Sequence, residues 1–364
     1  MISPPGAPLS TGVATETPPT GALFDDPTRS GPKRRISTRL LGLIGVLAAL
    51  VVVCLLSIAV GSRAIPLGDV WHALFSPSGT DTDTVVRELR IPRTVLGLLA
   101  GAALGLAGCI MQVLTRNPLS DPGLFGINQG AAAAIVIGIT LFGVTGPAAL
   151  VWFAFAGAVV ATVLVYGVST GNSGASAARF VLAGIAVQYV LVGLNQALQL
   201  ADRAALDRYR FWIIGSLANR DPEQLYVLGP VIGAGMLLAL ALAPGFNAMA
   251  LGDDTARALG AHVGRTKILG LLAVILLCGA ATAACGPIAF IGLMIPQIVR
   301  TLVGVDHRWV LPMSMLAAPV LLIGGDVVGR VINRPQEVQV GIITDVVGGL
   351  VFIFLIRRRR TAQL

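Results

Sequence analysis

The chain has 364 residues, of which 55% are hydrophobic and only 12% are Asp, Glu, Lys or Arg. An average soluble protein carries about 25% charged residues, so this composition excludes an ordinary soluble enzyme. The long uncharged runs also exclude a disordered or collagen-like chain. The formal net charge of +8 does not indicate nucleic-acid binding, because the basic residues form short clusters between apolar runs, as topology signals of a membrane protein do.

The amino-terminal residues 1–38 are rich in Pro, Thr, Gly and Ser and predict a disordered cytoplasmic tail. The tail ends in a basic cluster of Lys33, Arg34 and Arg35, with Arg39 directly after it. The apolar run Leu40–Val60 that follows is longer than the hydrophobic region of a signal peptide, and the chain stays membrane-like after it. We therefore interpret this run as a first membrane-spanning helix.

Nine further apolar runs predict additional membrane-spanning helices, since each span needs about 20 residues. They are Thr94–Leu114, Gly126–Phe142, Ala148–Tyr166, Phe180–Leu200, Leu225–Ala243, Ile268–Ala284, Ile288–Val303, Val310–Val328 and Gly341–Ile356. The expected fold is therefore an all-α, polytopic membrane domain of about ten helices over residues 39–357, with a short basic tail at 358–364. Ten spans place both termini on the same side of the bilayer.

The distribution of Lys and Arg indicates which side that is. If the amino terminus is cytoplasmic, most of the 26 Lys and Arg residues lie on the cytoplasmic side, as the positive-inside rule requires. Both termini are then basic and cytoplasmic. The basic residues left on the outer side are all arginines: Arg63, Arg87, Arg90, Arg93, Arg203, Arg208, Arg210, Arg220, Arg330 and Arg334.

A weak internal similarity links the two halves of the chain. The sequence AGAALGLAGCI at Ala100–Ile110 resembles CGAATAACGPI at Cys278–Ile288. In a count of ten spans these segments belong to helices two and seven, which run in opposite directions. This pattern predicts a possible inverted repeat of helices 2–5 and 7–10.

Three glycines mark one face of the second predicted helix. Gly97, Gly101 and Gly105 are spaced by four residues, so they expose bare backbone on one side of a helix. We expect a close helix contact there. Packing within the subunit is a better explanation than a dimer interface.

Three amides share a face of the otherwise apolar run Phe180–Leu200. Gln188, Asn195 and Gln199 lie at helical spacing, and amides that faced lipid would be costly. They face either protein or a water-filled path, and the sequence favours neither alternative. If they face a path, they are candidate translocation residues.

The longest predicted cytoplasmic connection, residues 244–267, is not membrane-like. Asp253 and Asp254 are expected to begin a short helix, which ends near Gly260. Ala256, Leu259 and His262 give this stretch amphipathic spacing. Because so short a helix is marginal in water, the stretch rests either on a partner surface or on the lipid interface.

The sequence contains no recognisable catalytic or metal-binding motif. A phosphate-binding loop of the form GxxxxGK[ST] is missing, and His, Cys and carboxylate residues do not show ligand spacing. We therefore expect no catalytic residue and no metal site. Any energy for uphill transport must come from a partner or an ion gradient.

Three segments carry a family resemblance. They are RIPRTVLGLLAGAALGLAGCIMQVLTRNPLSDPGLFGINQGAA from Arg90, FNAMALGDDTARALG from Phe246, and GPIAFIGLMIPQIVRTLVGVDHRWVLP from Gly286. Together they closely resemble the FecCD permeases, the membrane subunits of ABC importers for iron-siderophore complexes and vitamin B12. The resemblance extends from about residue 60 to residue 356.

The resemblance implies a set of partners and a location. A FecCD-type subunit lies in the cytoplasmic membrane and pairs with a second, like or related, permease around a central path. Two cytoplasmic ABC ATPase subunits use ATP and Mg, so the permease itself binds no cofactor. A binding protein delivers the cargo on the outer side. Nucleic acid is not among the expected partners.

The resemblance also implies roles for individual residues. The connection between helices six and seven resembles the family's ATPase coupling loop, which assigns that role to Asn247, Leu251, Gly252, Asp253, Ala256, Leu259 and Gly260. Arg90 and Arg93 of the RIPR motif, and Arg330 after an expected turn at Gly324-Gly325-Asp326, match positions that contact carboxylates of the binding protein. Arginine suits such contacts because its planar guanidinium forms bidentate hydrogen bonds.

Four residues depart from the family pattern. Gln297 replaces a customary His, Gln339 and Leu350 replace two prolines, and Asp345 replaces a small residue in helix ten. We expect Asp345 to pair with Arg330 or Arg334, with a role in a proton relay as the lesser alternative.

The resulting expectation is a permease subunit for import of iron-siderophore complexes, with ATP hydrolysed by a separate subunit. Haem or cobalamin is the alternative cargo. A proton-coupled secondary transporter is the rival from another class, because Asp326 and Asp345 lie near or within predicted spans. An integral membrane enzyme is the least favoured reading, since no catalytic set is visible.

Overall fold

The computed structural model describes residues 32–61, 65–76, 79–144, 146–169 and 177–361. Over these residues the chain is helical and contains no β-strand. The elements are α1 (Pro32–Ala59), α2 (Leu67–Phe75), α3 (Asp81–Thr84), η1 (Val85–Arg90), α4 (Ile91–Leu114), η2 (Pro122–Phe125), α5 (Ile127–Phe142), α6 (Pro147–Ser169), α7 (Ala177–Ala201), α8 (Arg203–Trp212), α9 (Glu223–Ala241), α10 (Ala243–Ala250), α11 (Asp253–Ala258), α12 (Val263–Val274), η3 (Ile275–Gly279), α13 (Ala280–Cys285), α14 (Ile291–Val303), α15 (His307–Ile332) and α16 (Val340–Thr361).

The fold is a polytopic membrane bundle, as the apolar runs predict. Seven helical stretches of the described chain are long and apolar enough to cross a bilayer, and three shorter apolar helices, α5, α14 and α16, occupy the other predicted spans. Helix α1 begins at Pro32, so residues 32–38, which the sequence assigns to the disordered tail, are helical. The remainder of that tail, residues 1–31, lies outside the described residues. The prediction of a turn at Gly324-Gly325-Asp326 is wrong, because α15 continues through these residues.

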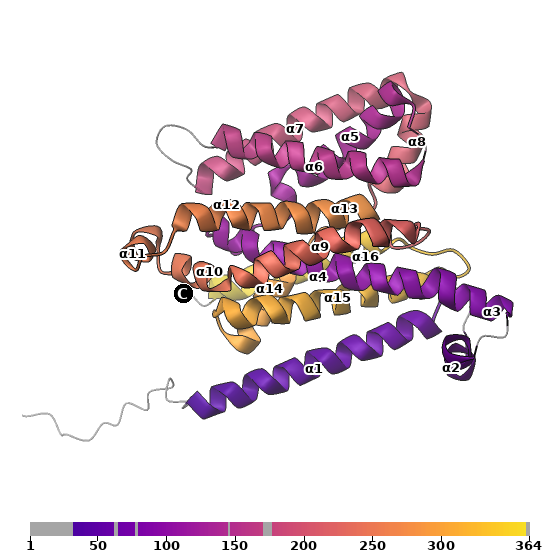
Figure 1. Ribbon diagram of the computed structural model, residues 1–364, viewed down its shortest axis with the longest axis horizontal. Helices are drawn as coiled ribbons and strands as arrows, with labels where there is room; N and C mark the ends of the chain where they lie inside the picture. Colours follow the sequence, from indigo (N-terminus) through magenta and orange to yellow (C-terminus); the bar gives the residue numbers. More distant parts are fainter. Residues whose placement is uncertain (1–31, 62–64, 77–78, 145, 170–176, 362–364) are drawn as a thin grey trace, which may run out of the picture.

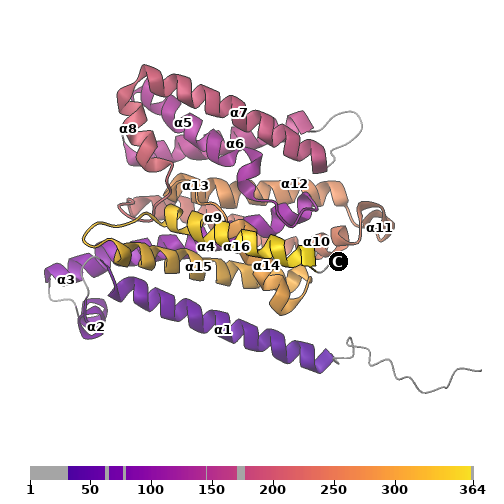
Figure 2. The same cartoon turned by 180° about the vertical axis from the view of Figure 1, so that it is seen from behind.

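The helices lie roughly side by side and form layers (Figure 1). One layer contains α5, α6 and α7, a central layer contains α4, α9, α12 and α13, and α15 separates this layer from α1. The view from behind places α16 over the central layer (Figure 2). In both views the start of α1 and the end of α16 lie at the same end of the bundle as α11, and α2 and α3 lie at the opposite end. We call these the cytoplasmic and the outer end, following the charge bias.

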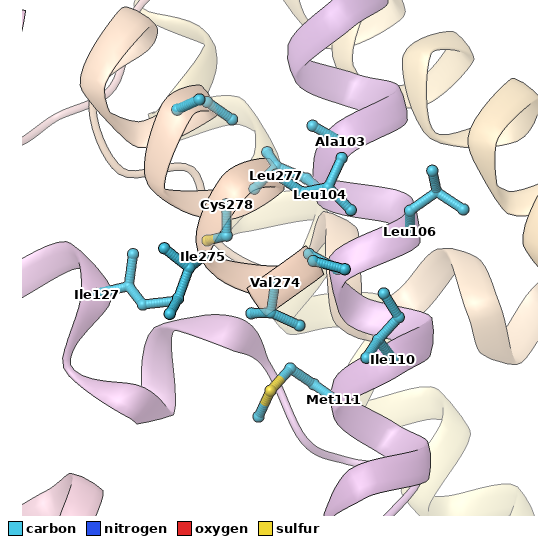
Figure 3. Packing of buried hydrophobic residues seen from close by; sticks show 14 of the residues in the cluster. Ala103, Leu104, Leu106, Ile110, Met111, Ile127, Val274, Ile275, Leu277 and Cys278 are labelled. Atoms are coloured by element: carbon cyan, nitrogen blue, oxygen red, sulfur yellow. The ribbon is translucent and has the colours of Figure 1, made fainter. Parts of the chain in front are cut away.

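Helix α4 is the centre of the bundle. Nearly all of its residues from Ala100 to Val113 are buried, and it contacts α15, α14, α12, η3 and α9. Figure 3 shows Leu104 and Ile110 of α4 packed beside Val274 and Leu277 of the α12–η3 segment. Such contacts require small side chains on at least one helix, which explains the high content of Gly and Ala in this stretch.

The glycine face of α4 lies against α15 of the same chain. A Cβ atom at Gly97 would lie 2.7 Å from Ile323 Cγ1, one at Gly101 would lie 2.6 Å from Pro319 Cα, and one at Gly105 would lie 2.6 Å from Ala318 Cβ. The three glycines therefore serve packing within the subunit, where the two backbones approach closely.

The tightest of these approaches provides a stability prediction. A Cβ atom at Gly108 would lie 1.9 Å from the carbonyl oxygen of Gly292, so Gly108→Ala must push α4 away from α14. We expect a loss of about 1–3 kcal/mol, as for other overpacked interiors. Thermal unfolding of the purified protein measures this loss. Gly193→Ala on α7 is the control, because open space surrounds that position; equal unfolding temperatures for the two variants would contradict the prediction.

Candidate functional site

The connection between α9 and α12 folds into two short helices, α10 and α11. The carboxylates Asp253 and Asp254 occupy the first turn of α11, where the helix dipole favours negative charge. Gly252 and Gly260 flank the helix at φ angles of +102° and +80°, which side chains larger than hydrogen rarely adopt. The expected short helix, begun by the two aspartates and ended near Gly260, is confirmed.

Asp253 fixes this connection to two other elements. Its carboxylate binds Arg116 Nη2 at 2.5 Å, from the connection that follows α4, and Lys267 Nζ at 2.7 Å, from α12. Partial burial opposes ionisation of Asp253, but the hydrogen bond and charge of Lys267, together with Arg116, outweigh it and hold the pKa of the carboxyl below its usual value. Asp253 is thus a clamp between α11 and the bundle.

The clamp has a pH dependence that can be measured. The pKa of Asp253 is lower in the folded state than in the unfolded state, where it is roughly 4. Asp253 therefore stabilises α11 at pH values above roughly 4, and this contribution is lost as the pH falls through the folded-state pKa. We expect Asp253→Asn to lose about 1 kcal/mol at pH 7, since the pair is partly exposed. The α11 amides should exchange hydrogen faster in this variant than in the wild type. After correction for the intrinsic exchange rate, their protection should no longer change between pH 3 and pH 5. Unchanged protection at pH 7 would contradict the clamp.

Asn247 fixes α10 to the start of α15. Its Nδ2 donates to Asp306 Oδ1 at 2.7 Å, and its Oδ1 accepts the backbone N–H of His307 at 2.8 Å. Burial opposes ionisation of Asp306, but the hydrogen bonds from Asn247 and from the N–H of Arg308 prevail and lower the pKa of its carboxyl. Sequence reasoning singled out Asn247 and Asp253 but missed their partners Arg116, Lys267 and Asp306, which lie 14 to 137 residues away along the chain.

The clamped segment exposes two apolar side chains at the cytoplasmic end. Leu251 and Leu259 are 61% and 68% exposed, whereas Ala256 is fully buried against the bundle. Ala256 therefore anchors α11 to its own chain, and Leu251 and Leu259 form exposed apolar surface at the cytoplasmic end. We call residues 243–260 the α10–α11 segment.

Two of the predicted outer arginines, Arg93 and Arg330, contact Asp326 at the opposite end of the bundle. Arg93 holds this carboxylate with two hydrogen bonds, Nε to Oδ2 at 3.0 Å and Nη2 to Oδ1 at 2.7 Å, and reaches Glu337 with Nη1 at 2.7 Å. Arg330 binds the same carboxylate from the next turn of α15. It also donates to the carbonyl oxygen of Ser57 at 2.7 Å, at the end of α1.

This network ties three helices together, and docking of a binding protein by its arginines stays a prediction. Arg330 is 2% exposed, and Arg90, also buried, donates to the carbonyl oxygens of Ile58 and Ala59 at 2.6 and 2.8 Å. Those carbonyls lie at the end of α1, where a helix has no internal donors for them. Arg90 and Arg330 are helix-end anchors, and the guanidinium of Arg93 is already held by Asp326 and Glu337.

Asp345 does not pair as expected. Arg330 binds Asp326 instead, and among the residues that the structure describes neither Arg330 nor Arg334 forms an ion pair with Asp345. The departure Gln297 is explained by a new contact, because its Nε2 donates to the carbonyl oxygen of Pro118 at 2.5 Å. The structure offers no explanation for Leu350, which is exposed.

The three amides of α7 are divided between environments. Asn195 is buried where α7 packs on α5, α6 and α8, which favours the protein-facing alternative for this residue. Gln188 and Gln199 are half-buried, and their role in a translocation path stays a prediction. No cluster of metal-ligating side chains occurs within the described ranges.

A comparison with family models matches residues 49–358 to the FecCD transport family. The chain belongs to the FecCD transport family. The ferric enterobactin transport system permease protein FepD of Escherichia coli is 47% identical over 324 residues, which cover 88% of this chain and 96% of FepD. The hemin transport system permease protein HmuU of Yersinia pestis is 34% identical and covers 90% of this chain and 98% of its own length.

A solved structure supports the same assignment. An inward-facing metal-chelate type ABC transporter matches with a TM-score of 0.77 at 25% identity, over 88% of this chain and 99% of that chain. This chain is thus a FecCD permease of the cytoplasmic membrane, and the family resemblance read from the sequence is confirmed. The helical bundle and its membrane location follow from the same match.

Proposed function

We propose that this chain is the permease subunit of an ABC importer that carries iron-siderophore complexes across the cytoplasmic membrane. The observation that carries the proposal is the 47% identity to a ferric enterobactin permease along nearly its whole length. Further relatives are named for iron-hydroxamate, at 38% identity, and ferric citrate, at 35%. All three names share an iron chelate as cargo.

The α10–α11 segment supports the proposed division of labour. ATP and Mg are used by two separate cytoplasmic ATPase subunits, and this chain binds no cofactor of its own. Leu251 and Leu259 supply apolar surface at the cytoplasmic end, and Asp253 and Asn247 hold that surface rigidly against α12 and α15. A rigid connection of this kind transmits movement of a docked ATPase into the bundle.

The other partners belong to the same proposal. A second permease, identical or related, completes the translocation path, and an extracytoplasmic binding protein delivers the cargo at the outer end. Docking of the binding protein at Arg90, Arg93 and Arg330 stays a prediction, and Arg90 and Arg330 also bind carbonyl oxygens of α1.

Haem and cobalamin are the alternative cargoes, supported by relatives named for hemin, at 34% identity, and for cobalamin, at 36%. A proton-coupled carrier is the alternative from another class, suggested by Asp326 and Asp345. Of these, Asp326 is held by the guanidinium groups of Arg93 and Arg330.

Uptake in a strain that lacks this chain tests the proposal. We expect the restored chain to support accumulation of radiolabelled iron bound to a catecholate or hydroxamate siderophore, and ATP depletion to abolish it. Labelled haem and cobalamin are the parallel arms. Accumulation of either of these, without any iron-siderophore uptake, would replace the proposed cargo, and uptake that survives ATP depletion under a maintained proton gradient would overturn the importer.

A further inference from the structure

A large cavity opens at the outer end of the bundle, beside the arginine network. Its volume is about 1040 Å³, near the upper limit for small-molecule pockets. The walls come from the start of α4, the connection between α8 and α9 (residues 213–222), and the connection between α15 and α16 (residues 333–339). Neither the helix anchors nor the α10–α11 segment needs a cavity of this size.

Arg220 is a basic residue of the cavity wall whose side chain donates to backbone carbonyl oxygens. Its Nε donates to the carbonyl oxygen of Ser216 at 3.0 Å and its Nη2 to that of Cys285 at 3.1 Å. Four carboxylates also line the cavity, yet none of the described carboxylates lies within ion-pair distance of Arg220. Burial lowers the pKa of Arg220.

The surrounding backbone holds Arg220 in a fixed position. The N–H of Ser216 donates to the carbonyl oxygen of Cys285 at 2.7 Å, and the N–H of Gly341 donates to that of Gly215 at 3.1 Å. Gly215 adopts a φ of +71°, and a Cβ there would lie 2.2 Å from the carbonyl oxygen of Pro287. The connection is therefore wedged between the end of α13 and the start of α16, and the guanidinium is preorganised for binding.

Two amide oxygens in the cavity wall lack donors. The Oε1 atoms of Gln224 and Gln339 are buried and accept no hydrogen bond from the part of the chain that the structure describes. Gln224 is only 7% exposed. A buried acceptor without a donor costs about 1–3 kcal/mol, so a ligand that supplies donors would gain from both amides.

We propose that this cavity is a binding site for a small hydroxycarboxylate, whose carboxylate pairs with Arg220 and whose hydroxyl group donates to Gln224 or Gln339. The combination of an unpaired guanidinium and two free acceptors fits a ligand that is anionic and also carries hydrogen-bond donors. An acidic side chain of a partner protein is the competing occupant. The recessed position of Gln224 and the size of the cavity favour the small molecule.

Calorimetric titration of the purified full-length chain in lipid nanodiscs tests the site, with citrate as the probe. It requires no transport, so its failure is distinguishable from failure of the proposed importer function. We expect saturable binding of citrate and weaker binding of tricarballylate, which has the same three carboxylates but no hydroxyl. Gln224→Leu should reduce the preference for citrate. Absence of saturable binding to the wild-type protein would overturn the proposal.

Two variants of Arg220 distinguish an arginine that pairs with the ligand from one that only supports the fold. Arg220→Gln should weaken citrate binding by about tenfold to a hundredfold, the effect of a lost charged hydrogen bond, whereas Arg220→Lys retains part of the affinity. Arg334→Gln removes one exposed positive charge from the same end, does not line the cavity and should leave the affinity unchanged.

The outcomes against the proposal are equally definite. An Arg220→Gln variant that unfolds at lower temperature but binds citrate as the wild type does would make Arg220 a structural brace only. If citrate does not bind, and Arg220→Gln instead weakens capture of the extracytoplasmic binding protein, the site belongs to a protein carboxylate. Should Arg220→Gln fail to fold, Gln224→Leu and the citrate-to-tricarballylate ratio decide.

Discussion

Asp326→Asn is expected to destabilise this protein severely, because it leaves the buried guanidinium of Arg330 without a carboxylate partner and Arg93 with Glu337 alone. Asp326 is 1% exposed and is the carboxylate that Arg93 and Arg330 share. Removal of one partner from a buried ion pair costs about 3–5 kcal/mol. The same change should weaken the hydrogen bond from Arg330 to the carbonyl oxygen of Ser57, so α1 should detach from α15 at the outer end.

The measurement is the thermal unfolding of the purified protein, together with the amount of folded protein in the membrane. Asp345→Asn is the matched control, since it removes a carboxylate from an exposed membrane-helix position without breaking an ion pair to any described residue. We expect the control to unfold near the wild-type temperature. If Asp326→Asn is as stable as Asp345→Asn, the network is not a structural lock.

The arginine network contains contacts that could not be predicted from the sequence. Arg93 and Asp326 are 233 residues apart, and nothing local to the RIPR motif reveals that its second arginine is already paired. The excess of outer arginines was correctly observed, but the sequence did not reveal that Arg90, Arg93 and Arg330 also bind groups of their own chain. One signal was available: Asp326 and Arg330 are spaced as i and i+4, which is the spacing of an ion pair within a continuous helix.

Structural features that depend only on residues close together in the sequence were predicted well. Apolar runs located the membrane helices, because a spanning helix satisfies its own backbone and needs only length and hydrophobicity. The two aspartates and Gly260 located α11 for the same local reasons. Arg220 was noted only as one of the outer arginines, since its position against Cys285 depends on how the α8–α9 connection folds onto α13.

The structure also divides the predicted coupling residues by task. Asn247, Asp253 and Ala256 face the chain itself, and they fix the α10–α11 segment through hydrogen bonds, ion pairs and burial. Leu251 and Leu259 face outward. In the proposed complex the ATPase would therefore meet a small apolar surface on a rigid support, so that one substitution there would break the coupling.

Leu259→Asp is expected to abolish uptake while leaving the permease folded. The side chain is 68% exposed in the isolated chain, so the carboxylate stays hydrated there and costs the fold little. In the proposed complex the same carboxylate would be buried without a partner, at a cost of several kcal/mol, which is enough to dissociate a small docking contact. Leu251→Asp should act in the same way, and Leu259→Met, which keeps an apolar side chain, is the control.

Co-purification of the ATPase subunits and uptake of the iron-siderophore complex are measured for each variant, with thermal unfolding to verify the fold. Retained ATPase association together with normal uptake in both aspartate variants would show that the α10–α11 segment does not dock the ATPase, and the bilayer interface would then be its contact.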